Sequence, residues 1–207
     1  MKIYAITLSF LLGTSVLTAG PCAQKTCKGC AALPDSNAPV ILSASAEEAL
    51  LFQIDEERMA GELYRAFGKQ WSARPFKNIP RAEDRHHALL LGLAARAGLS
   101  PVGATTAGRF EMAAVQTRYD NLLASGEASL ISAFKAGALL EEQDIADLQT
   151  LVAATDNEDL KSVATILEAG SRNHLRAFVR NLRSRGIEYA PQILPEDEFD
   201  RIIGAGR

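Results

Sequence analysis

Hydrophobic residues recur every three or four positions along most of the chain, which is the spacing of one face of an α-helix. Four long stretches and one short stretch show this period, and we expect helices at about 45–68, 77–97, 110–123, 128–153 and 157–185. No segment alternates apolar and polar residues with the β-branched enrichment that is typical of strands. The pattern therefore predicts an all-α fold.

Start and stop signals support these limits. Glu47 and Glu48 fall in the first turn of the first stretch, where the helix dipole favours acidic side chains. Gly98 ends the second stretch, and the polar residues 155–158 provide an N-cap for the last one. The tail from Tyr189 onward contains two prolines and is expected to lie across the helices.

The second and third long helices are joined by a long connection that carries the short helix at 110–123. Four long helices with one long crossover form the topology of a ferritin-like four-helix bundle. A helical bundle of another connectivity is the alternative that the pattern leaves open.

Composition and charge limit the function classes. The 207 residues are 47% apolar and 23% charged, which is enough for one sizeable core but not for two ordinary domains. A formal net charge of −3 creates no basic field that would attract nucleic acid, so we expect no nucleic-acid partner. We therefore expect one helical domain at 45–207.

The first 20 residues have the pattern of a secretory signal peptide, because Lys2 precedes an apolar run that ends in small residues. We therefore expect an exported protein of the periplasm or the cell envelope, with an uncleaved anchor as the alternative. Lipidation of Cys22 stays open but is disfavoured, since the proline directly before it departs from the lipoprotein cleavage pattern.

Residues 21–44 are expected to form a flexible linker that contains all three cysteines, Cys22, Cys27 and Cys30. In an oxidising compartment these thiols would form a disulfide within or between chains. A zinc or iron–sulfur site would need a fourth ligand, and none lies nearby. Cys27-Lys-Gly-Cys30 lacks the βαβ context of a thioredoxin-like redox motif.

Carboxylates and imidazoles fall on the apolar faces of the helices when each helix is projected at 100° per residue. The stripe of the second long helix contains Glu83 and His86, with His87 at its edge. The inward-facing residues of this kind on the other long helices are Glu57, then Glu141 with Asp144 beside it, then His174. Glu56 competes with Glu57, and Glu142 with Glu141, so both choices stay open.

These buried acids need a counter-charge, because an ionised carboxylate alone in a core is strongly destabilising. The lysines and arginines lie mostly on outer faces, so a metal cation is the simplest solution. Taken singly, an inward His174 is more often a satisfied core residue, and an inward Glu57 more often reaches a rim or caps a neighbour. The coincidence across four helices favours a metal site. The i,i+3 spacing of Glu83 and His86 suits one ion, and carboxylates with imidazoles suit iron, manganese or zinc.

Two motifs, Glu57-x-x-Ala60-x-x-x-Tyr64 and Glu83-x-x-His86, resemble the first half of rubrerythrin and other ferritin-like di-iron carboxylate proteins. The segments EERMAGELY, NIPRAEDRHH, GALLEEQDIADL and GSRNHLRAFVRNL resemble more closely an uncharacterised ferritin-like family of bacteria and archaea. The resemblance covers about residues 45–202. Its motifs are specific as a set and weak singly.

The resemblance implies that Glu57, Glu83, His86, Glu141 and His174 are metal ligands. Ser171 stands where the last helix of a di-iron protein would carry a glutamate. Asp144 would supply the missing carboxylate, unless the second metal position is weak or empty. Tyr64 would donate a hydrogen bond near the metal, quench radicals or simply pack in the core, and packing is favoured.

The implied activity is that of a mononuclear or di-iron site acting on O₂ or peroxide, which makes the chain an oxidoreductase-like protein. No rubredoxin-like CxxC…CxxC module is present, so the electron donor is not identified. A large cage is not indicated, and a homodimer stays open. The alternatives are a metal carrier, or a non-catalytic bundle for structure or interaction with a degenerate metal site.

Overall fold

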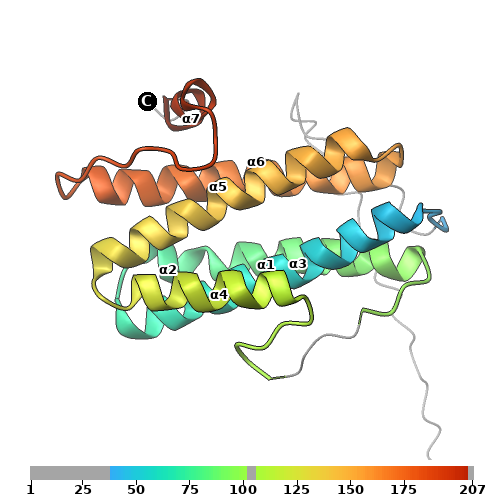
Figure 1. Cartoon of the computed structure of the whole chain (residues 1–207), viewed down its shortest axis with the longest axis horizontal. Helices are drawn as coiled ribbons and strands as arrows, with labels where there is room; N and C mark the ends of the chain where they lie inside the picture. The colour runs from blue at the N-terminus through green and yellow to red at the C-terminus, as the bar shows by residue number, and fades with distance from the viewer. Residues whose placement is uncertain (1–37, 102–105, 205–207) are drawn as a thin grey trace, which may run out of the picture. The chain divides into compact units, whose positions relative to one another are not determined.

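The computed structural model describes residues 38–101 and 106–204, and these residues form helices and connections without strands. The helices are α1 (Ala44–Gln70), α2 (Arg74–Asn78), α3 (Pro80–Arg96), α4 (Ala113–Gly126), α5 (Leu130–Ala154), α6 (Glu158–Arg183) and α7 (Glu196–Gly204) (Figure 1). The all-α prediction is therefore confirmed for this part of the chain. The expected signal peptide and the three cysteines lie outside the described residues. Among the seven helices, none is both long and apolar enough for a membrane span.

The long helices form two antiparallel pairs (Figure 1). In one pair α1 packs on α3, with α2 at the turn between them, and in the other α5 packs on α6. The connection from α3 to α5 carries α4, which packs against both α1 and α5. This arrangement lets α1, α3, α5 and α6 face a common interior.

Capping residues set the ends of these helices. The side chains of Ser43, Ser129 and Asn157 accept hydrogen bonds from the backbone N–H three residues later, at 3.3, 3.0 and 3.0 Å. Gly98 and Gly186 follow α3 and α6 with φ values of +73° and +72°, which favour glycine. Local sequence signals therefore position the helices along their axes.

Two boundaries differ from the sequence-based predictions. The helix that was expected to be continuous from residue 77 is divided at Pro80. This proline has no backbone N–H to donate to the carbonyl oxygen of Phe76, and its ring clashes with that carbonyl, so α2 ends at Asn78. No helix was predicted in the tail, which contains α7. Phe199 and Ile202 of α7 are each 2% exposed, and their packing against the rest of the chain stabilises this helix. The acidic sequence with prolines before it did not predict the helix.

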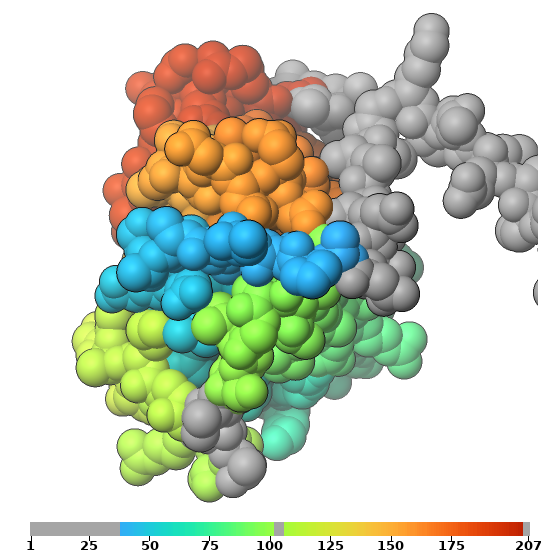
Figure 2. All heavy atoms as spheres, turned by 90° about the vertical axis from the view of Figure 1, so that its right-hand side faces the viewer, coloured from blue at the N-terminus to red at the C-terminus, as the bar shows by residue number. Residues whose placement is uncertain are grey.

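One end of the helices is joined by polar contacts of the first described residues. The backbone N–H of Val40 donates to the carbonyl oxygen of Arg96 at 3.0 Å, and the Asn157 side chain donates to the carbonyl oxygen of Ile41 at 3.1 Å. Figure 2 views this end, where the beginning of α1 lies between the beginning of α6 and the end of α3.

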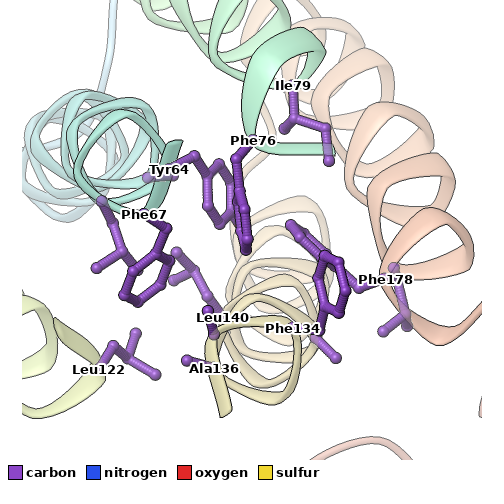
Figure 3. Close-up of a cluster of buried hydrophobic side chains, with 14 of the residues drawn as sticks. Tyr64, Phe67, Phe76, Ile79, Leu122, Phe134, Ala136, Leu140 and Phe178 are labelled. Carbon is purple, nitrogen blue, oxygen red and sulfur yellow. The ribbon is translucent and has the colours of Figure 1, made fainter. Parts of the chain in front are cut away.

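Buried hydrophobic residues form two clusters along the helices. The first contains aromatic rings whose neighbouring centroids lie 5.2–6.4 Å apart. Its rings come from α1, α2, α5 and α6 and are Tyr64, Phe67, Phe76, Phe134 and Phe178 (Figure 3). The second is mostly aliphatic and includes Leu50, Leu90, Leu148, Leu160 and Leu167. The polar residues singled out in the sequence lie where these two clusters meet.

Candidate metal centre

A layer of acidic and imidazole side chains separates the two hydrophobic clusters. On α1 the layer lies between Ile54 of the aliphatic cluster and Met59 of the aromatic cluster, and on α6 between Leu167 and Leu175. Each of its five central side chains is at most 8% exposed, and they are Glu57 of α1, Glu83 and His86 of α3, Glu141 of α5 and His174 of α6. The layer is therefore largely shielded from water on both sides.

Glu83 belongs to two groups at once. Its Oε2 lies 3.0 Å from Nδ1 of His86, which in turn lies 3.3 Å from Oε2 of Glu57. Its Oε1 lies 3.0 Å from Nδ1 of His174, which lies 3.5 Å from Oε2 of Glu141. Within each group one donor atom from every residue lies within 4.8 Å of the others. Each group thus contributes two carboxylates and one imidazole, with Glu83 shared.

Several atoms of this layer that could bind a metal ion have no hydrogen-bond partner. Of the seven buried side-chain nitrogen and oxygen atoms without a partner in the described residues, four are here: Glu57 Oε1, Glu83 Oε1, Asp144 Oδ1 and His174 Nδ1. Glu83 Oε1 and His174 Nδ1 are close together, but their orientation does not make a hydrogen bond. Buried polar atoms are rarely left in this state, so these four atoms are free to bind a cation or a water molecule.

Charges within the layer shift its pKa values strongly. Burial raises the pKa of Glu57 to about 7, with Glu83 and Glu141 adding to the rise. Burial also raises the pKa of Glu141, against the effect of His174. Burial acts in the same direction on Glu83, but His174 and His86 outweigh it and lower the pKa of Glu83 to about 2. Without a metal, Glu83 is therefore ionised between the two rings.

The histidines show the matching behaviour. Burial opposes protonation of His86, but Glu57 and Glu83 outweigh it and raise its pKa to about 10. Burial likewise opposes the charge of His174, while Glu83 and Glu141 raise its pKa well above its usual range. The layer thus binds protons when no other cation is present. A donor set of three carboxylates and two imidazoles fits iron, manganese or zinc, which would replace those protons.

Tyr64 contacts one of the candidate ligands. Its hydroxyl donates a hydrogen bond of 2.5 Å to Oε1 of Glu141, and its ring packs 5.2 Å from that of Phe178 (Figure 3). The side chain therefore packs in the core and also donates a hydrogen bond to a candidate ligand. The hydrogen bond leaves Oε2 of Glu141 to face His174.

Gly170 allows His86 to approach α6 closely. A Cβ atom at this position would lie 2.5 Å from both Cε1 and Nε2 of the His86 ring, far inside van der Waals contact. The ring therefore rests against the backbone of α6, and its Nδ1 is directed toward the carboxylates. The two imidazole rings lie 5.7 Å apart at their centroids.

Asp144 lies beside the central five residues and is 7% exposed. Its Oδ2 contacts the hydroxyl of Ser171, which replaces the glutamate expected on α6. Burial raises the pKa of Asp144 well above its usual range, and the negative charges of Glu57 and Glu141 add to the rise. Asp144 therefore shares the electrostatic environment of the layer, although it belongs to neither group of three.

The competing acids Glu56 and Glu142 have protein partners instead. Glu56 pairs with Arg118 and accepts a hydrogen bond of 3.0 Å from the Gln53 side chain. Glu142 accepts hydrogen bonds from the Tyr189 hydroxyl at 2.6 Å and from three backbone N–H groups of residues 192–194 at 2.9–3.0 Å. The structure therefore gives Glu56 and Glu142 structural contacts and directs Glu57 and Glu141 toward the histidines.

Other acidic side chains of α5 and α6, and His87, lie away from the layer. Asp147 pairs with Arg118 at 3.0 Å, and Glu168 pairs with Arg172 at 2.7 Å. His87 is partly buried and lines a groove of about 460 Å³ on the other side of α1 and α3, together with Asp55 and Arg58. Burial and Arg58 lower the pKa of His87.

Sequence reasoning missed two contributions. Nothing in the sequence indicates that residues 192–194 bind Glu142, since the contact joins segments that are far apart in the chain. The apolar pattern of the last long helix likewise does not reveal Gly170 as a steric requirement. A glycine inside a helix is unfavourable by about 1 kcal/mol relative to alanine, and that cost was the available signal.

Comparison with known proteins identifies the family. Residues 46–206 match the family described as uncharacterized protein domain DUF2202. The uncharacterized protein MJ0754 of Methanocaldococcus jannaschii is 36% identical over 165 residues, which are 79% of this chain and 89% of that protein. The crystal structure of hypothetical protein MJ0754 aligns with a TM-score of 0.76 and 36% identity, covering 78% of this chain and 93% of that one. This chain belongs to the DUF2202 family.

Proposed function

We propose that the chain is a ferritin-like protein that binds two iron ions between α1, α3, α5 and α6, and that this pair acts on O₂ or peroxide. The observation that carries the proposal is the position of Glu83, whose two carboxylate oxygens each lie 3.0 Å from a different histidine Nδ1. A carboxylate shared in this way suits two adjacent cations better than one.

The buried side-chain atoms without a hydrogen-bond partner also support a metal pair. A hydrogen-bonded polar network would satisfy its members, whereas Glu57, Glu83 and His174 each keep a buried donor or acceptor without a partner. Three carboxylates in a dry layer also require positive charge. The five side chains alone supply it only by binding protons.

The arrangement of the helices supports the ferritin-like part of the proposal. Two antiparallel pairs are joined by a connection that carries α4, and each of the four long helices contributes at least one side chain to the layer. Ferritin-like di-metal proteins share this plan, with glutamates and Glu-x-x-His motifs that project inward.

Iron bound here would supply the capacity to exchange electrons with O₂ or peroxide. The protein side chains would hold and shield it. Glu57 and His86 would bind one ion, Glu141 and His174 the other, and Tyr64 would orient Glu141. The two hydrophobic clusters would limit the access of water, and an external reductant would complete a cycle.

The proposal also places the protein in the periplasm or cell envelope, on the basis of the signal-peptide pattern in the first 20 residues.

Metal analysis tests the proposed function directly. After anaerobic reconstitution with Fe(II), we expect about two iron equivalents per chain, and Fe(II)-dependent consumption of peroxide or O₂. Metal content near zero would contradict the proposal and favour a non-catalytic helical protein. Two iron equivalents without any consumption of peroxide or O₂ would indicate a metal carrier. Tighter binding of manganese or zinc would replace iron as the proposed metal.

The Gly170→Ala variant is expected to bind iron about 10- to 100-fold more weakly than the unmodified protein. The new methyl group would collide with the His86 ring and turn Nδ1 away from the carboxylates. Titration of the metal-free protein with Fe(II) under anaerobic conditions measures the change.

Gly92→Ala on α3 is the matched control, because an added Cβ there would meet no atom within 4 Å. It should keep the full iron affinity and gain a little stability from the better helix propensity of alanine. If Gly170→Ala and Gly92→Ala bind Fe(II) with equal affinity, His86 is not a metal ligand.

A further inference from the structure

Asp144 has an unused carboxylate oxygen beside the candidate metal centre. The residue lies on α5 one turn after Glu141, and its Oδ1 is buried without a partner. Its position one turn from Glu141, and the contact of its Oδ2 with Ser171 one turn before His174, place it beside the group that contains Glu141 and His174. Nothing in the described protein structure accounts for the unpaired oxygen.

Ser171 holds the other oxygen of Asp144. It lies on α6 one turn before His174, and its hydroxyl contacts both Oδ2 of Asp144 and the carbonyl oxygen of Leu167, the latter at 3.1 Å. A hydroxyl has one proton to donate, so it can serve an ionised Asp144 only by giving up Leu167. This contact fixes the carboxyl group from the side opposite its free oxygen.

The charge of the centre favours one more acid. Two divalent ions carry four positive charges, whereas Glu57, Glu83 and Glu141 provide three negative charges when both histidines are neutral. One positive charge would remain in a shielded layer, where an unbalanced charge is costly. Asp144 is the buried acid beside the layer whose free oxygen could balance it.

We propose that Asp144 is the fourth carboxylate of the metal pair, held on α5 by the hydroxyl of Ser171 in place of a glutamate on α6. This inference rests on the proposed function, because it assumes that two metal ions bind. With Asp144 as a ligand, the centre that holds two divalent ions is electrically neutral. Asp144 also completes the ligands of the second metal ion, whose position the sequence alone left in doubt.

The Asp144→Asn variant tests this role, since it keeps the size of the side chain and can still contact Ser171. We expect the weaker of the two Fe(II) equivalents to bind about 10- to 100-fold less tightly. The thermal midpoint of the metal-free variant should stay the same or rise, because asparagine keeps the shape of the side chain and adds no charge. If Asp144 has only a structural role, Asp144→Asn should instead lower the thermal midpoint and leave the iron affinity unchanged. That result would overturn the inference.

Moving the carboxylate provides a second measurement. Asp144→Ala should lose affinity for the same equivalent, and adding Ser171→Glu to it should recover that affinity, since the acid then comes from α6. Asp147→Asn is the control on the same helix, because Asp147 pairs with Arg118 outside the layer. Iron binding by Asp144→Asn equal to that of the unmodified protein would overturn this inference alone. An unmodified protein that binds no metal would overturn the proposed function as well.

Discussion

Replacing Glu83 with alanine is expected to abolish binding of both metal ions, with affinity falling by more than about 100-fold for each. Residues that only orient a ligand typically cost 10- to 100-fold in affinity when mutated, and a shared ligand should cost more. Each oxygen of Glu83 faces a different histidine, so its removal takes one donor from each group of three. Anaerobic titration with Fe(II), followed by elemental analysis of the desalted protein, measures the loss.

Two further variants make this result specific. Glu57→Ala should lose one equivalent and keep the other, because Glu57 belongs only to the group that contains His86. Asp84→Ala changes the neighbouring residue of α3, which is exposed and pairs with Arg65 on the surface. It should retain both equivalents, since exposed ion pairs contribute little to stability. If Glu83→Ala and Glu57→Ala lose the same single equivalent, Glu83 is not shared.

The metal-free protein is expected to lose several kcal/mol of folding free energy between pH 6 and pH 9. The folded-state pKa of Glu57 is raised from 4.5 to about 7 and that of His86 from 6.5 to about 10, while His174, Glu141 and Asp144 shift upward as well. Each of these groups binds protons more tightly in the folded protein than in the unfolded chain. Its contribution is therefore lost as pH rises between its unfolded and folded pKa values, at about 1.4 kcal/mol per pKa unit.

Glu83 shows the opposite dependence. Its pKa is lowered from 4.5 to about 2, so its contribution is present above pH 4.5 and is lost as pH falls toward 2. The metal-free protein should therefore be most stable near pH 5. Denaturant unfolding in the presence of a chelator, repeated across this pH range, measures the curve.

Bound metal should reverse the trend above pH 6. The ions would occupy the place of the protons, and their affinity should rise with pH because the ligands must be deprotonated. His87→Gln is the control, since burial and Arg58 lower the pKa of His87, in the direction opposite to the shifts of the two histidines in the layer. This variant should keep the decline above pH 6.5. A metal-free protein whose stability is constant from pH 6 to pH 9 would contradict the electrostatic account of the layer.

The sequence by itself determined the helices and the faces that they bury. The period of the apolar residues gives α1, α5 and α6 to within a few residues, because caps such as Ser129, Asn157 and Gly186 act locally. The same projection placed Glu83, His86 and His174 in the interior, since the angle between side chains on one helix is fixed by its geometry. It could not foresee α7, whose helix depends on packing of Phe199 and Ile202.

Only the tertiary structure decided between neighbouring carboxylates. Glu141 and Glu142 differ by a single 100° step, and so do Glu56 and Glu57, which is too small a difference for a projection to resolve. The choice depends on what each side chain meets: Arg118 pairs with Glu56, and the backbone of residues 192–194 binds Glu142. Those partners come from distant parts of the chain, and their position follows from how the helices pack rather than from any local pattern.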